Sequence, residues 1–153
     1  MRSLFLLTTL ACLACSSAHA GLGGAPSDFG NAAAVRARQL SAVAPGTASA
    51  SAYTVKESTL DSGTVVREYV GADGVVFAVS WNGPFLPDLR TLLGSRFATM
   101  TAATQARPTG GRGQLRIDND DVVIESGGHM RAWSGRAWLP GALPAGVTSG
   151  DIQ

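Results

Sequence analysis

His129, in the segment ESGGHMRAW, is the side chain of this sequence best suited to acid–base chemistry. Histidine is the side-chain type most often used to accept or release a proton in enzyme reactions. A serine hydrolase would also need an activated serine, and the sequence has no G-x-S-x-G motif to provide one. Glu125 lies four residues earlier and is a candidate to orient the ring. These residues leave three readings open: a small hydrolase-like enzyme that uses His129, a ligand contact without catalysis, and a histidine at an ordinary loop-to-strand junction.

A binding surface is the second kind of chemistry that the residue types offer. The candidates are His129, Arg131, Trp133, Trp81 and Phe85. Aromatic rings and an arginine could line a groove for a sugar or a peptide. In a small domain, however, large aromatic side chains mostly fill the core. We therefore expect Trp81 and Phe85 to pack at the corner between a strand and a helix, and we expect a ligand surface nearer to His129 and Arg131.

The sequence disfavours a metal site. Asp118, Asp120 and Asp121 place three carboxylates within four residues, and Ca²⁺ prefers oxygen ligands of this kind. An EF-hand loop needs a glycine at its sixth position, where this sequence has Val123. A zinc site would need more nitrogen and sulfur ligands than residues 21–153 supply, since they contain one histidine and no cysteine. We therefore expect no metal and no cofactor, and a solvated hairpin turn at 118–121.

The first twenty residues have the pattern of a secretory signal peptide. A basic residue precedes an apolar run from Leu4 to about Cys15, and a small-x-small site ends at Ala20. We expect cleavage after Ala20 and export to the periplasm or secretion from the cell. The apolar run is shorter than the ~20 residues of a membrane-spanning helix, so we expect no transmembrane segment in the mature chain. A lipid anchor on Cys15 is disfavoured, because Leu13 and Cys12 are not the usual neighbours of a lipidated cysteine.

Cleavage would also change the charge and the redox chemistry of the chain. It removes Arg2, so that 11 basic residues would face 11 acidic ones and the net charge would be zero. A neutral chain offers no electrostatic basis for binding nucleic acid or an anionic membrane surface. Cleavage removes both cysteines of the sequence as well, so the mature chain would have neither a disulfide nor a cysteine nucleophile.

Residues 21–52 are rich in alanine, glycine and serine. Asp28 could cap a helix from about Asn31 to Val43, but its mostly alanine face would gain little stability from burial. Pro45 and Gly46 would end that helix, and a low-complexity connector would follow. We therefore expect a flexible, loosely attached arm over 21–52 with at most one marginal helix, and a single ordered domain over 53–153.

The rest of the chain predicts an α+β fold. Alternating and apolar segments separated by turns predict an antiparallel meander over 53–81 and further strands over 113–139. Between them, apolar residues spaced by three and four positions predict one main helix over about 87–105. The order of these elements indicates an antiparallel sheet with the helix packed on it.

Arg96 falls on the apolar flank of the predicted helix. Its aliphatic stem would cover the edge of the sheet. Alternatively, its guanidinium would pair with a carboxylate, for which Asp88 and Glu68 are the candidates.

Two blocks of the sequence carry a resemblance to a known family. They are SGTVVREYVGADGVVFAVSWNGPFLPDLRTLLG (62–94) and SGGHMRAWSGRAWLPGALPAGV (126–147). Together they resemble an uncharacterised family of exported proteobacterial proteins, the domain of unknown function 2844, from about Tyr53 to the C-terminus. The resemblance implies an exported single domain. It implies no activity, cofactor, partner or catalytic residue.

The residues favour a non-enzymatic periplasmic or secreted module that binds another exported or envelope protein. This reading depends on the single histidine and the missing thiol of the mature chain, its neutral charge and the lack of a catalytic motif. Two alternatives stay open, namely the hydrolase-like enzyme that uses His129 and a structural envelope protein held by the edge of its sheet.

Overall fold

The computed structural model describes residues 20–30, 32–43, 50–106 and 114–153. Nearly all of the predicted signal peptide, including Cys12 and Cys15, lies outside these residues. The strands are β1 (Ala32–Val43), β2 (Ala50–Leu60), β3 (Val65–Val70), β4 (Val76–Gly83), β5 (Leu115–Asp118), β6 (Val123–His129) and β7 (Ala132–Trp138). The helices are α1 (Leu89–Leu93) and α2 (Phe97–Gln105), joined by a short 3₁₀ turn at Gly94–Arg96.

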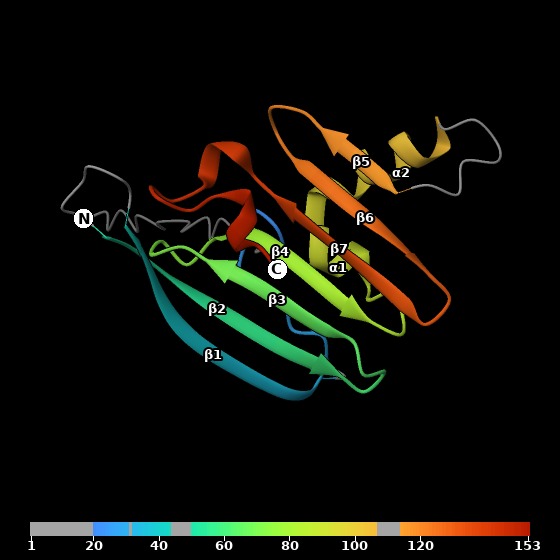
Figure 1. The fold of residues 1–153 in the computed structure, drawn as a ribbon, viewed down its shortest axis with the longest axis horizontal. Coiled ribbons are helices and arrows are strands. Elements are labelled where there is room, and N and C mark those ends of the chain that lie inside the picture. The colour runs from blue at the N-terminus through green and yellow to red at the C-terminus, as the bar shows by residue number, and fades with distance from the viewer. Residues whose placement is uncertain (1–19, 31, 44–49, 107–113) are drawn as a thin grey trace, which may run out of the picture.

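The seven strands form one antiparallel sheet in the order β1-β2-β3-β4-β7-β6-β5 (Figure 1). β1 to β4 form a meander, and the C-terminal strands continue the sheet from β4, with β7 as its neighbour. The prediction of an α+β fold, with strands over 53–81 and 113–139 and one main helix over about 87–105, is confirmed. No helix in the described ranges is long and apolar enough to cross a membrane.

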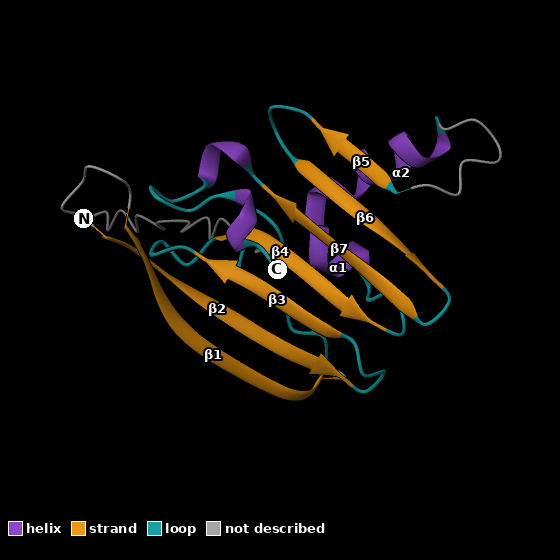
Figure 2. Cartoon of the chain, in the orientation of Figure 1, coloured by secondary structure: helices purple, strands orange, loops and turns teal. Residues whose placement is uncertain are grey.

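The two faces of the sheet are covered by different parts of the chain (Figure 2). On one face, here called the back face, the helix buries Leu89, Leu92 and Leu93 against apolar side chains of the strands. On the opposite face, the front face, the C-terminal segment (residues 140–153) packs Val147 and Ile152 against a second apolar cluster. The fold is therefore a sheet between two unequal layers.

The prediction of a marginal helix between Asn31 and Val43 is wrong. Ala32–Val43 form β1, which pairs with β2 along this range, and Asn31 lies outside the described residues. The helix propensity of alanine is a small free energy that tertiary contacts often outweigh. Here the hydrogen bonds with β2 stabilise a strand instead. The expected domain start at Tyr53 also falls inside β2.

Residues 20–30, called here the N-terminal segment, are packed on the back face, and all of them except Ala20 belong to the arm that was expected to be flexible. Leu22 is 2% exposed and belongs to the same apolar cluster as the helix. Its N–H donates to Leu92 O at 3.0 Å, and the main chains of Gly23 and Gly24 exchange hydrogen bonds with Val76 of β4. This segment is therefore part of the folded domain.

A break in the main helix makes room for the N-terminal segment. Gly94 adopts φ +54° and ψ −130°, so the α-helical bonding pattern stops there and the carbonyl of Leu92 is free to accept from Leu22. A side chain on Gly94 would lie 3.1 Å from Ala20 O. Glycine at this position thus serves both the backbone conformation and the close approach of the two segments.

Glu68 of β3 ties the N-terminal segment to the sheet from inside the protein. Its side chain is 1% exposed, and its Oε1 accepts from the N–H of Ser27 at 2.8 Å. The Lys56 ammonium lies 3.8 Å from the other carboxylate oxygen, Oε2, which is too far for a hydrogen bond, and Oε2 has no hydrogen-bond partner among the residues that the structure describes. Burial raises the pKa of the Glu68 carboxyl, although the Ser27 and Lys56 contacts act to lower it.

Leu22→Ala should lower the free energy of unfolding by about 2–5 kcal/mol, because it leaves a cavity in the back-face core. Leu86→Ala is the matched control: Leu86 is 45% exposed, so its truncation should change stability by less than about 0.5 kcal/mol. Urea unfolding of both variants provides the comparison. Equal small effects would show that the N-terminal segment contributes nothing to the core.

Glu68→Gln should change the pH dependence of stability. A carboxyl whose pKa is raised by folding holds its proton more tightly in the folded chain, so stability is greatest below the unfolded pKa of about 4.3. That contribution is lost as the pH rises through the raised folded pKa, and the variant, which does not titrate there, should gain stability relative to the wild type. Unfolding free energies measured in urea from acid to neutral pH give the difference. A difference independent of pH, or one that falls as the pH rises, would contradict the assignment.

Candidate functional site

One residue from each strand contributes to a row that crosses the front face, here called the charged row. In spatial order the residues are Arg36, Glu57, Arg67, Ser80, Arg136, Glu125 and Arg116. Each is the register partner of the next, and neighbouring side chains of an antiparallel pair lie on the same face of the sheet. The register therefore aligns four arginines and two glutamates that are far apart in the sequence.

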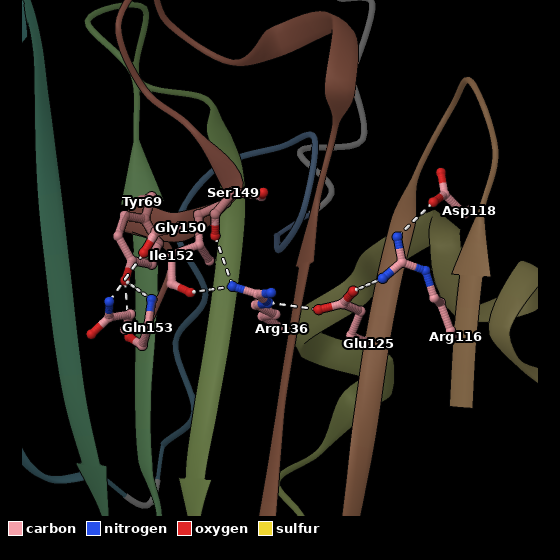
Figure 3. Close-up of polar contacts among 9 residues, drawn as sticks. All are labelled: Tyr69, Arg116, Asp118, Glu125, Arg136, Ser149, Gly150, Ile152 and Gln153. Carbon is pink, nitrogen blue, oxygen red and sulfur yellow. Dashed lines mark hydrogen bonds and ion pairs between the residues drawn. The ribbon is translucent and has the colours of Figure 1, made fainter. Parts of the chain in front are cut away.

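Ion pairs join the row on both sides of its centre. Arg67 Nε lies 2.8 Å from Glu57 Oε2, and Arg136 Nε lies 2.8 Å from Glu125 Oε2. Arg116 contacts the other oxygen of Glu125 and lies 2.8 Å from Asp118 Oδ2 (Figure 3). The hydrogen bond to Asp118 and the charge of Glu125 raise the pKa of Arg116, so its guanidinium stays charged. Both glutamates of the row are thus held by arginines.

The centre of the row lacks an acid. Arg67 and Arg136 flank Ser80, and main-chain oxygens of the C-terminal segment supply the acceptors there (Figure 3). The main-chain oxygen of Gln153 accepts from Arg67 Nη1 at 3.0 Å, from Tyr69 Oη at 2.9 Å and from Ser80 Oγ at 2.8 Å. Arg136 Nη1 donates to the carbonyl oxygens of Ser149 at 2.8 Å and Ile152 at 3.3 Å. The row therefore binds a stretch of polypeptide through its main chain.

Local structure of the C-terminal segment supports this contact. Thr148 and Asp151 form a capping box around the turn at Ser149–Asp151, and the hydrogen bonds from Thr148 lower the pKa of Asp151. Ile152 is fully buried against the front-face aromatic cluster. Apolar packing on one side and main-chain hydrogen bonds on the other thus fix residues 149–153 over β3 and β4.

Two hollows lie on either side of Gln153, which borders both of them. The first hollow, of about 460 Å³, lies over β4, β7, β6 and β5 and contains the Arg136–Glu125–Arg116 end of the row. The second hollow, of about 660 Å³, lies over β1, β2 and β3 and contains the Arg36–Glu57–Arg67 end. The docked C-terminal segment thus divides the front face into two parts.

His129 lies at the end of β6, beside the turn to β7, and is exposed. Its ring contact is Nδ1 with the main-chain oxygen of Met130, at 3.2 Å. Glu125, expected as a candidate to orient the ring, instead bonds Arg116 and Arg136. Within the described ranges, the structure therefore gives His129 no carboxylate partner and no serine nucleophile.

Arg131 and Trp133 line a third hollow of about 440 Å³, near Pro84 at the end of the sheet. Arg131 adopts φ +66°, which fits its position in the tight β6–β7 turn. The structure thus places Arg131 and Trp133 in one hollow, outside the charged row.

Trp81 and Phe85 have different environments. Trp81 is 2% exposed in the back-face core, and its ring occupies the space that a side chain at Gly135 would need. Phe85 is 58% exposed, so the expectation that it packs at the corner is wrong. The corner is held by hydrogen bonds instead, because Thr64 Oγ1 donates to the carbonyl of Phe85 at 2.7 Å.

Arg96, in the turn between α1 and α2, contacts the acidic turn at 118–121. Arg96 makes two hydrogen bonds with the carboxylate of Asp121, at 3.2 and 3.0 Å, so its guanidinium does pair with a carboxylate, and the partner is Asp121 in place of the named candidates Asp88 and Glu68. Asp88 caps helix α1 instead, accepting from Arg90 N and Thr91 N. In the part of the chain that the structure describes, no three His, Cys, Asp or Glu residues are grouped so that they could hold a metal ion.

The charged row itself was not predicted from the sequence. The signal was present as charged residues at strand positions, among them Glu57, Arg67 and Arg136. Their alignment depends on which strands are neighbours and on the register of each pair. The sequence pattern also indicates a helix where β1 lies. The docking of residues 149–153 depends on side chains more than 70 positions earlier in the sequence, so no local pattern indicates it.

The fold and the site define an α+β protein whose sheet carries a row of arginines and glutamates, and in which Arg67, Ser80 and Arg136 of that row hold the C-terminal segment of the same chain through main-chain oxygens. The chain belongs to the family described as Protein of unknown function (DUF2844), whose model matches residues 18–152. This match confirms the resemblance stated from the two sequence blocks and extends it into the N-terminal segment. No curated protein and no solved structure matches the chain.

Tyr69→Phe should lower the free energy of unfolding by about 1–3 kcal/mol, since the Tyr69 hydroxyl bonds both the oxygen and the N–H of Gln153. Tyr53→Phe is the control, because Tyr53 packs in the same aromatic cluster and its hydroxyl makes no hydrogen bond to the described residues. Amide exchange at residues 149–153, measured with chemical denaturation, reports the effect. Equal responses of the two variants would show that main-chain binding does not hold this segment.

Proposed function

We propose that this protein is an exported, non-enzymatic module that binds an extended segment of another exported or envelope protein in the first hollow. The observation that carries this proposal is the docking of residues 149–153. The front face already holds one stretch of polypeptide by hydrogen bonds from Arg67, Tyr69, Ser80 and Arg136 to main-chain oxygens. A partner's segment would use the same chemistry beside it.

The first hollow continues the surface that binds the C-terminal segment. Ser80 and Arg136 belong to both, and the hollow extends past Gln153 to Asn82 and Ser134, which are exposed. Serine hydroxyls and asparagine amides can donate to carbonyls and accept from N–H groups. Such side chains can bond the alternating N–H and C=O groups of an extended peptide. Binding of this kind depends little on the side chains of that peptide.

The charges of the first hollow favour a ligand that is polar but close to neutral. Arg136 and Arg116 share Glu125, and Arg116 also pairs with Asp118. The volume of about 460 Å³ lies within the range of ligand sites. Guanidinium groups already satisfied by carboxylates still have N–H donors to offer to carbonyl oxygens.

Two further features support an exported protein without catalysis. The first twenty residues have the pattern of a secretory signal that would be cleaved after Ala20. The acidic groups of the charged row are engaged in ion pairs, and His129 stands away from them at the β6–β7 turn. The arrangement supports binding better than general acid–base catalysis.

Site-specific photo-crosslinking in the native host tests this function. A crosslinking residue at Ser134, on the floor of the first hollow, should yield one discrete crosslinked exported protein, identified by mass spectrometry. The same residue at Asp73, in the exposed turn between β3 and β4, is the control and should not yield it. Sequencing of the isolated protein should find Gly21 as its N-terminal residue in the exported fraction.

A synthetic peptide that spans the crosslinked segment then gives the affinity. Ser134→Trp, which fills the hollow, should weaken binding at least about tenfold, or 1.4 kcal/mol, and Asp73→Trp should leave it unchanged. Identical crosslinks from Ser134 and Asp73 would overturn the proposal. So would a peptide that binds Ser134→Trp as tightly as the wild type.

A further inference from the structure

The second hollow has a charge pattern that the proposed function does not use. Arg36 and Arg38 lie two residues apart on β1, which is an edge strand of the sheet, and both line this hollow. Both are exposed, and neither has an ion-pair or hydrogen-bond partner among the residues that the structure describes. Alternation along the strand places both guanidinium groups on the front face.

The acidic residues of the second hollow are already engaged. Glu57 accepts from Arg67 Nε at 2.8 Å, although it is also the register partner of Arg36. Asp151 accepts from the N–H and the hydroxyl of Thr148, each at 2.8 Å. The three arginines of the hollow, Arg36, Arg38 and Arg67, thus outnumber its two side-chain carboxylates, Glu57 and Asp151, by one positive charge.

The floor of the hollow is suited to holding the body of a small molecule. Val55 and Tyr69 line it and are nearly fully buried, at 7% and 4% exposure. Arg38 is the register neighbour of Val55, which in turn pairs with Tyr69. A buried floor with two cations at its rim resembles the general layout of ligand sites, in which a few polar groups fix the orientation.

We propose that the second hollow binds a small anionic ligand through a carboxylate or phosphate group held by Arg36 and Arg38. The guanidinium group presents a planar pair of N–H donors that matches the oxygens of either group. Arg67, held by Glu57 and Gln153, forms the inner wall. This site is separate from the first hollow, so each can fail without the other.

Titration of the folded protein with citrate and, separately, with inorganic phosphate tests this site and distinguishes the two oxyanion classes. Calorimetry gives the affinity, and amide chemical shifts locate it. We expect saturable binding of at least one probe, with shifts on β1, β2 and β3. Arg36→Gln/Arg38→Gln should weaken that binding at least tenfold. Arg36→Lys/Arg38→Lys, which keeps the charge but loses the planar fork, should give an intermediate affinity.

Arg90→Gln/Arg131→Gln is the matched control, since it removes two exposed arginines outside the second hollow. This variant should change the affinity less than twofold, as should Ser134→Trp in the first hollow. Saturable binding of neither probe would overturn the proposal, as would equal weakening by the control and the Arg36/Arg38 variant. If the glutamine variant does not fold, the lysine variant and the location of the chemical shifts still decide.

Discussion

Arg67 and Arg136 face the same point on the front of the sheet from either side of Ser80, and the described residues place no Asp or Glu side chain between them. Main-chain oxygens of residues 149, 152 and 153 act as the acceptors instead. Two partly buried cations this close need such acceptors, because unpaired charge is costly away from water. The position of the C-terminal segment, the division of the front face into two hollows and the binding surface beside it all depend on this contact.

On the back face, a buried charged side chain also bonds a main-chain group. There a carboxylate, Glu68, is buried under the N-terminal segment and receives the N–H of Ser27. Both faces thus use a charged side chain of β3 or β7 to hold a main-chain group of a segment remote in sequence. The two segments cover the sheet where the short helix does not reach, which explains how a domain with one main helix buries both faces.

The sequence predicted the parts of this structure that depend on local pattern. The apolar spacing around Leu89 and Leu93 placed the helix, and alternation placed β2 to β7, because these signals reflect burial of one face. β1 was misread because an alanine-rich strand at a sheet edge has a helix-like composition, and only its pairing with β2 reveals it. The charged row needed β1, the neighbour order and the register together, so local patterns could not have predicted it.

The docking of residues 149–153 has a consequence for how the chain reaches its native state. Synthesis proceeds from the N-terminus, yet Gln153 bonds Arg67, Tyr69 and Ser80, which are 86, 84 and 73 positions away in sequence. β4 likewise can form its hydrogen bonds with β7, its neighbour in the sheet, only after β7 has been synthesised. Pairings between such distant positions slow folding, because the conformational entropy of closing a long loop is lost before the stabilising contacts form. The contacts of residues 149–153 with β3 and β4 therefore form only after the whole of the sheet has been synthesised.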